Sequence, residues 1–373
     1  MIWVAWRQFR TQALVTLGLL AAFAVLVLVT GLHLRNVYSS IGGAHCGARN
    51  HCSALLGGAL SSVLGPAMLA IPALLGMFWG APLLGRELES GTYRLAWTQS
   101  VTRRRWLSVR VALVGLAALA VAGVASWLVS WWFAPLDAVN MNRFDPTVFT
   151  ERGVVAIGYA GFAFALGVAT GTLMRRTLPA MVATLLGFVT VRYAFTVWVR
   201  PHLLPAKEIL SSVTAGKGVG FGGSPSGVTI LAGSPPLPNT WQLSSTLVDR
   251  AHHTLSAAQL HDLLVRACPT IANPVGGGGK GPVNGPVLAV LRCQDVLRRH
   301  LQLLVAYQPP GHFWPLQALE TGIFLAAAFA LIGATLWRVG PRAARKGAAG
   351  EPGERTANPL ALDIAPERLS RSN

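Results

Sequence analysis

Six stretches of this chain are long and apolar enough to cross a lipid bilayer, and they constrain its fold more than any other feature. A helix needs about 20 apolar residues to span the hydrocarbon core. Charged residues make up only 12% of the chain, and a soluble domain carries about twice that share. We therefore expect an all-α integral membrane protein with six transmembrane helices. Their predicted ranges are 13–34, 56–82, 111–134, 153–174, 178–199 and 314–337.

The segment before span one has the pattern of a helix of its own. Trp3, Trp6 and Phe9 recur at helical spacing beside Arg7 and Arg10. This pattern fits an amphipathic helix at 1–12 that lies in the plane of the membrane. The same residues can equally form the first turns of span one.

In span two, three prolines predict a kink or an interrupted helix: Pro66, Pro72 and Pro82.

The distribution of basic residues sets the predicted orientation. Arg and Lys are enriched in the cytosolic flanks of transmembrane helices. The richer flanks hold Arg7, Arg10, Arg86, Arg94, Arg103, Arg104, Arg105, Arg110, Arg175, Arg176, Arg338, Arg342, Arg345 and Lys346, and the opposite short loops hold Arg35, Arg49, Arg143 and Arg152. We therefore expect a multi-pass protein of the plasma membrane with both termini in the cytosol.

The same basic residues explain the net charge of +17. In a soluble protein such a charge would indicate a nucleic-acid partner. At the ends of membrane spans it orients helices and attracts anionic lipid. We expect membrane lipid, and no nucleic acid, to be in contact with this surface.

The orientation places residues 200–312 outside the cell, between spans five and six. The chain has four cysteines, and all four fall on this side: Cys46, Cys52, Cys268 and Cys293. An even number in an oxidising compartment indicates disulfides, and proximity favours Cys46–Cys52 and Cys268–Cys293, although four free thiols are the alternative. We predict a small, loop-rich, disulfide-tied extracellular domain, with helices at 256–267 and 294–306. Residues 313–338 then form the last span, and 339–373 a disordered cytosolic tail.

The segment 85–106 lies between spans two and three and carries both signs of charge. Gly91 and Thr92 can end one helix and cap the next. Leu95, Ala96 and Trp97 then give the second helix an apolar face. We expect two short helices about this corner that dock on a cytosolic partner; an ordinary interfacial loop is the alternative.

This segment resembles the coupling region of type-2 ABC exporter permeases, and the last span, Tyr307–Val339, looks like that of actinobacterial members. With the order of spans and the large domain before span six, the likeness covers nearly the whole chain. It implies a partner ABC ATPase that binds ATP and Mg²⁺, and a working dimer with a second, identical or related, permease copy. The residues that match the coupling pattern are Glu87, Glu89, Gly91, Thr92, Leu95, Thr98, Arg103, Arg104 and Arg105.

We expect no cofactor, metal or catalytic site in this chain itself. Residues 276–281, GGGGKG, look like a phosphate loop, but Pro274 stands at the leading glycine position and Gly281 follows Lys280 where Ser or Thr is needed. His252, His253, His261 and Asp262 are metal-binding residue types. They are more simply explained as the solvated surface around a short helix.

Two charged residues fall inside predicted spans. Arg192 lies on span five and Glu320 on span six, each about 10 Å from the outer boundary at 1.5 Å per residue. A lone charge there is costly, so we predict an ion pair between them. This pair either holds the two spans together or contacts cargo near an external exit.

Together these features predict the membrane-spanning permease subunit of an ABC exporter, carrying an unidentified amphipathic substrate. A different class of protein is the alternative: a membrane-anchored sensor or assembly protein whose external domain binds a ligand of the cell envelope.

Overall fold

The computed structural model describes residues 2–40, 58–90, 103–137, 143–144, 146–212, 219–224, 227–233, 237, 239–269 and 287–339. Within these residues, six helices are long and apolar enough to cross a membrane, as the sequence predicts. They cover Arg10–Ser40, Val63–Arg86, Arg105–Asp137, Val155–Met174, Thr177–His202 and Pro310–Val339. The chain is therefore a multi-pass membrane protein with six candidate spans.

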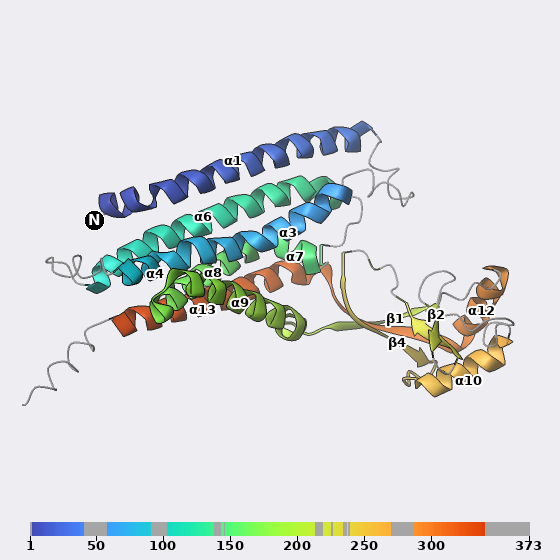
Figure 1. Ribbon diagram of the computed structural model, residues 1–373. Helices are drawn as coiled ribbons and strands as arrows, with labels where there is room; N and C mark the ends of the chain where they lie inside the picture. Colours follow the sequence, from blue (N-terminus) through green and yellow to red (C-terminus); the bar gives the residue numbers. More distant parts are fainter. Residues whose placement is uncertain are drawn as a thin grey trace, which may run out of the picture.

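The helices form an elongated bundle, and a smaller domain projects from one end of it (Figure 1). The other end holds the start of α1, the end of α4, the start of α6 and the end of α13. The helices of the bundle are α1 (Ile2–Ser40), α3 (Gly58–Leu75), the π-helical turn η2 (Gly76–Gly80), α4 (Ala81–Ser90), α6 (Arg103–Asp137), α7 (Pro146–Glu151), α8 (Val155–Met174), α9 (Thr177–Ala194), the π-helical turn η3 (Phe195–Val199), the 3₁₀ turns η4 (Arg200–His202) and η5 (Pro310–His312), and α13 (Phe313–Val339).

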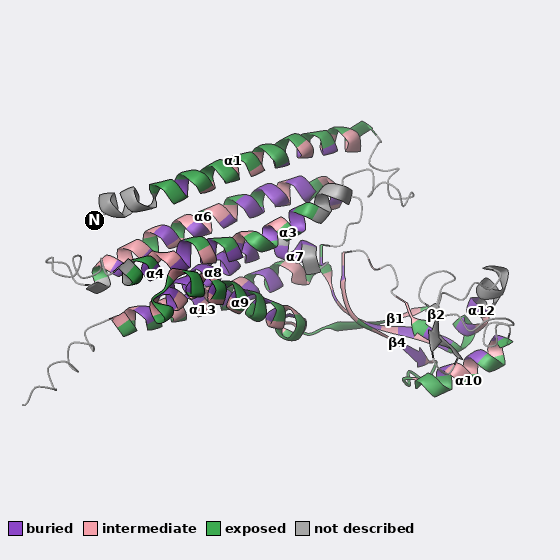
Figure 2. Cartoon of the chain, in the orientation of Figure 1, coloured by how far each residue is buried: buried purple, intermediate pink, exposed green. Residues whose placement is uncertain are grey.

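Helix α1 runs without a break from Ile2 to Ser40. Residues 2–12 are thus helical, as both interpretations of this segment require. From Arg10 to Ser40, most of α1 is exposed (Figure 2). It packs on α6, where the Trp132 Nε1–H donates to Thr30 Oγ1 at 3.1 Å and Arg35 Nη2 donates to the Trp131 carbonyl at 3.2 Å.

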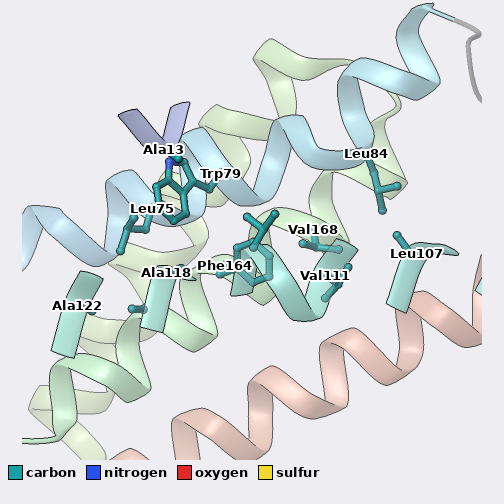
Figure 3. Close-up of a cluster of buried hydrophobic side chains, with 12 residues drawn as sticks. Ala13, Leu75, Trp79, Leu84, Leu107, Val111, Ala118, Ala122, Phe164 and Val168 are labelled. Carbon is teal, nitrogen blue, oxygen red and sulfur yellow. The ribbon is translucent and has the colours of Figure 1, made fainter. Parts of the chain in front are cut away.

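Helix α8 is the centre of the bundle and is buried over most of its length (Figure 2). Its small residues allow neighbouring backbones to approach closely, because van der Waals packing is the main attraction between helices in lipid. At Gly167, a side-chain carbon would lie within 2.8 Å of the Ala81 amide nitrogen. Phe164 of α8 fills the space between Trp79 of η2 and Val111 of α6 (Figure 3).

Span two is one continuous helix, Val63–Arg86, that contains an irregular turn. Pro66 and Pro72 lie inside α3, and the π-helical turn Gly76–Gly80 follows them before α4 begins. A proline removes one backbone N–H from the helical ladder, and π-helical turns, which are rare, occur mostly as single turns inside α-helices. Gly76 and Gly80 in this turn face the backbone of α8, so the irregular turn packs closely on α8.

The domain between spans five and six, residues 207–308, contains strands that the sequence did not predict. Three antiparallel strands are ordered β1-β5-β4, and β2 pairs with β3 in a separate hairpin. The elements are β1 (Lys207–Ser212), β2 (Val219–Ser224), β3 (Gly227–Ala232), β4 (Trp241–Asp249), α10 (Ala257–Ala267), α12 (Val287–His300) and β5 (Leu301–Gln308). We call this unit the inter-span domain.

The predicted helix at 294–306 is wrong beyond His300, where β5 begins. Leu301, Leu303 and Val305 are buried, and the residues between them are partly exposed. This two-residue alternation is the pattern of a strand with one covered face. Hydrogen bonding to β1 on one side and β4 on the other then outweighs the helical preference of the leucines.

The helix predicted at 256–267 is confirmed as α10. Ser256 and Gln259 form a reciprocal capping box at its start. The predicted disulfide Cys268–Cys293 is also confirmed, with a Cα–Cα distance of 5.5 Å across 25 residues of sequence. Both cysteines are buried in the core of the inter-span domain beside Leu264 and Leu297. Cys46 and Cys52 lie outside the described residues.

Candidate functional site

The charged segment at 85–106 is described only at its two ends. Helix α4 carries the chain out of span two to Ser90, and α6 begins at Arg103. Arg105, in the first turn of α6, is exposed. The remaining candidate residues of the coupling pattern, or their side chains, lie outside the described part: Glu87, Gly91, Thr92, Leu95, Thr98, Arg103 and Arg104.

Glu89 near the end of α4 binds the start of α9. Its Oε2 atom accepts hydrogen bonds from the Thr177 backbone N–H at 3.0 Å and from Thr177 Oγ1 at 2.7 Å. Thr177 is the first residue of α9, where backbone N–H groups have no partner within the helix and the helix dipole attracts negative charge. Glu89 therefore caps α9 from a different helix.

The electrostatics of this contact favour the ionised carboxylate. The pKa of Glu89 is lowered from its ordinary value, first by the hydrogen bond from the Thr177 hydroxyl and then by the one from the Thr177 backbone, with a further contribution from the charge of Arg176. The turn that leads into α9 is short, because Arg175 ends α8 in the left-handed conformation at φ 54°. Glu89 thus fastens the end of span two to the turn between spans four and five.

A second polar site is buried inside the bundle. Glu320 of α13 accepts two hydrogen bonds from Arg200, from Nε to Oε2 and from Nη2 to Oε1, both at 2.9 Å. Tyr159 of α8 donates its hydroxyl to Glu320 Oε1 and accepts from Arg200 Nη2 at 3.0 Å. Arg200 is 2% exposed and Glu320 is fully buried. This two-pronged geometry with additional hydrogen bonds is what makes a buried ion pair tolerable.

The predicted ion pair between Arg192 and Glu320 is therefore wrong in one partner. Glu320 pairs with Arg200 and not with Arg192. We expected Arg200 to lie at the membrane boundary, but the π-helical turn Phe195–Val199 and the turn Arg200–His202 extend span five to His202. In a regular α-helix, residues eight apart point about 80° away from each other. The wider π-turn offsets this rotation, so Arg192 and Arg200 both reach Tyr159.

Arg192 lies beside this pair without joining it. Its guanidinium carbon is 3.9 Å from the centroid of the Tyr159 ring, a cation–π contact. The residue is 8% exposed. Its Nε and Nη1 atoms are buried and have no hydrogen-bond partner among the described residues. We call Tyr159, Arg192, Arg200 and Glu320 the buried cluster.

Gln317, one turn before Glu320, was not predicted as a site residue. Its Oε1 accepts from the Val155 N–H at 3.0 Å, and its Nε2 donates to the carbonyls of Phe149 at 2.8 Å and Arg152 at 3.1 Å. These bonds fix the turn between α7 and α8 against α13. An uncharged amide inside an apolar span is the signal that identifies such a residue, because a polar side chain in lipid must find a partner.

A large groove lies between α1 and the α3–α4 region, with a volume of about 1180 Å³. Its walls are mostly apolar, including Leu19, Phe23 and Phe78. Polar side chains, among them Gln12 and Arg86, also line it. The groove has room for a molecule that combines an apolar body with a polar group.

The described residues contain no group of three or more His, Cys, Asp and Glu side chains that could hold a metal ion. His253 instead lies with its Nδ1 3.6 Å from Asp249 Oδ2, at the surface of the inter-span domain. The phosphate-loop-like residues 276–281 lie outside the part of the chain that the structure describes.

The sequence profile of a family described as ABC-2 membrane transporter related matches residues 17–200. This range takes in most of span one, spans two to five and the charged segment, and it ends at Arg200. No curated protein and no solved structure matches the chain.

Proposed function

Because the chain belongs, over residues 17–200, to the ABC-2 membrane transporter related family, we propose that it is the membrane-spanning permease subunit of an ATP-driven ABC exporter. The observation that carries this proposal is the position of the charged segment within the matched range. Its two described ends, Ser90 and Arg103, lie at the end of the bundle opposite the inter-span domain (Figure 1). A soluble ATPase on one side of the membrane can reach this segment, and the inter-span domain then faces the other side.

The proposed orientation puts both termini and residues 85–106 in the cytosol. The excess of Arg and Lys at this end of the bundle supports it. The disulfide Cys268–Cys293 at the opposite end supports it independently, because disulfides persist in oxidising compartments.

In the proposed mechanism the partner ATPase supplies ATP hydrolysis, with ATP and Mg²⁺ bound in that partner and none in this chain. Residues 85–106 dock on the ATPase and move with it. Helix α4 and helix α6 continue directly from this segment, and Glu89 adds a connection to the start of α9. A displacement of the segment is therefore passed to spans two, three and five together. A second permease copy, identical or related, completes the transport path.

The proposed cargo is amphipathic. The groove between α1 and the α3–α4 region supports this, because it joins apolar walls to a few polar groups.

An alternative function is favoured by the inter-span domain, which has its own disulfide-linked core. A membrane-anchored sensor or assembly protein would use that domain to bind an envelope ligand and would need no ATPase.

The two functions differ in what copurifies with the full-length chain. We would purify it from its native membranes in mild detergent, identify the copurifying proteins and assay ATP hydrolysis. An ABC ATPase in stoichiometric amount, with activity that falls when Gly91 is replaced by Pro, supports the exporter. A pure chain without any ATPase, isolated in folded form, supports the sensor or assembly protein instead.

A further inference from the structure

The buried cluster carries more positive than negative charge. Arg192 and Arg200 are cationic, because arginine stays protonated in proteins, and the carboxylate of this cluster, Glu320, forms its ion pair with Arg200. Both oxygens of Glu320 are already taken by Arg200, and one of them also by Tyr159. The charge of Arg192 is therefore left over.

Arg192 has little to compensate it. Its contact with the Tyr159 ring stabilises a cation but supplies no opposite charge. A buried charge that lacks an ionic partner is strongly destabilising. Its Nε and Nη1 atoms have no hydrogen-bond partner among the described residues, whereas buried polar atoms in proteins nearly always have one. A bound anion would balance the surplus charge and accept from these donors.

We propose that the buried cluster binds the acidic group of an amphipathic molecule, a phosphate or a carboxylate attached to an apolar body, with Arg192 as the residue that contacts the anion. This inference rests on the proposed export function only in that it names the chemical class of the cargo. Guanidinium groups suit either anion, since their planar donors bind two oxygens at once.

The position of Arg192 favours an anion that arrives with an apolar body. Arg192 lies ten residues before His202, the end of span five, which is about 15 Å along a helix and near the middle of the hydrocarbon core. Its neighbours Val191 and Tyr193 are exposed on the outer face of the bundle. An acidic group tethered to an apolar body can reach this depth along the face of α9, where a free aqueous anion would have to leave water entirely.

The test is a binding measurement on the full-length chain in nanodiscs of neutral phosphatidylcholine, with labelled lysophosphatidic acid as the probe. Lysophosphatidylcholine is the neutral control, a fatty acid carries the carboxylate, and inorganic phosphate represents the free anion. For Arg192→Gln we expect affinity for lysophosphatidic acid to fall about tenfold or more, since one charged contact is lost. Arg192→Lys keeps the charge but loses the planar pair of donors, so it should retain only part of the affinity.

Two further variants make the result specific. Glu320→Gln removes the competing carboxylate and should increase the affinity for the acidic lipid several-fold. Arg338→Gln, an exposed arginine near the far end of α13, should leave it unchanged. Equal affinity in the wild type and Arg192→Gln would overturn the inference, and so would displacement of the probe by inorganic phosphate alone. If Arg192→Gln fails to fold, as judged by thermal unfolding, the wild-type affinities decide the question: equal affinity for lysophosphatidic acid and lysophosphatidylcholine would overturn the inference.

The measurement needs no ATPase. Loss of the predicted binding in a chain that still copurifies with an ABC ATPase would therefore count against the anion site and leave the proposed function standing. Binding that follows these predictions in a chain that copurifies with no ATPase would support the anion site and count against the proposed function.

Discussion

Glu89 caps helix α9 through Thr177, a residue 88 positions further along the chain. Its Oε2 atom accepts both the backbone N–H, at 3.0 Å, and the side-chain hydroxyl, at 2.7 Å. Two helices that flank different loops at the same end of the bundle are joined by this carboxylate. The contact provides a route by which a displaced charged segment would also move span five.

Replacement of Glu89 by Ala should loosen the start of α9. The Thr177 amide loses its acceptor and becomes open to exchange, so its hydrogen exchange, measured by mass spectrometry on the full chain, should accelerate about tenfold or more. Glu208→Ala, an exposed carboxylate on β1, is the matched control and should leave Thr177 protected. Unchanged protection in Glu89→Ala would show that the cap does not hold α9.

Acid should weaken the same contact. The pKa of Glu89 is lowered by its hydrogen bonds to Thr177, so the ionised form is the one that the fold favours. The contribution of Glu89 is complete above the ordinary glutamate pKa of about 4.3 and is lost as the pH falls through the lower folded-state value. The protection factor of the Thr177 amide should therefore be constant from neutral pH to about 5 and drop below that. In Glu89→Gln this drop should be absent; its persistence would assign it to another group.

The buried pair should be more sensitive to loss of one partner than of both. Arg200→Met alone leaves Glu320 as a buried charge, which we expect to destabilise the chain by about 3–5 kcal/mol. The double variant with Glu320→Leu removes both charges of the pair. It should unfold at a temperature close to that of the wild type. Thermal unfolding in detergent measures this difference. As a contrast, Asp249→Asn breaks an exposed pair with His253 and should change little. A double variant as unstable as Arg200→Met alone would contradict a simple charge-compensation role.

Close packing of α8 predicts a position-specific effect of one methyl group. At Gly167 the added carbon would meet backbone atoms of Gly76, Gly80 and Ala81, which cannot move aside as a side chain can. Gly167→Ala should destabilise the chain by about 1–3 kcal/mol. Gly333→Ala, where no atom lies within 4 Å, should be neutral or slightly stabilising because alanine favours helix. Equal melting temperatures for the two variants would mean that the bundle is looser here than the structure shows.

The sequence was sufficient for features that depend on local pattern. The six spans follow from hydropathy, the short helix predicted at 256–267 is α10, and the pairing of Cys268 with Cys293 follows from proximity and compartment. Each of these depends on residues close together in the chain.

Features that depend on distant contacts were missed or assigned wrongly. The partner of Glu320 is decided by a π-helical turn that brings Arg200 onto the same face as Arg192. The amino-acid composition of this segment does not predict such a turn. The strand β5 forms because β1 and β4 lie on either side of it. The contact of Glu89 with Thr177 likewise depends on how two spans pack. Periodicity in one segment carries no information about its neighbours in space.

The most direct test of the proposed function is site-specific photo-crosslinking from the charged segment. A photoreactive residue at Leu95 of the full-length chain, irradiated in native membranes, should yield a covalent product with an ABC ATPase subunit. The same residue placed at Ser256 in the inter-span domain should yield none. Crosslinking to an ATPase from Leu95 alone would support the export mechanism; crosslinks from Leu95 only to envelope components on the opposite face of the membrane would contradict it.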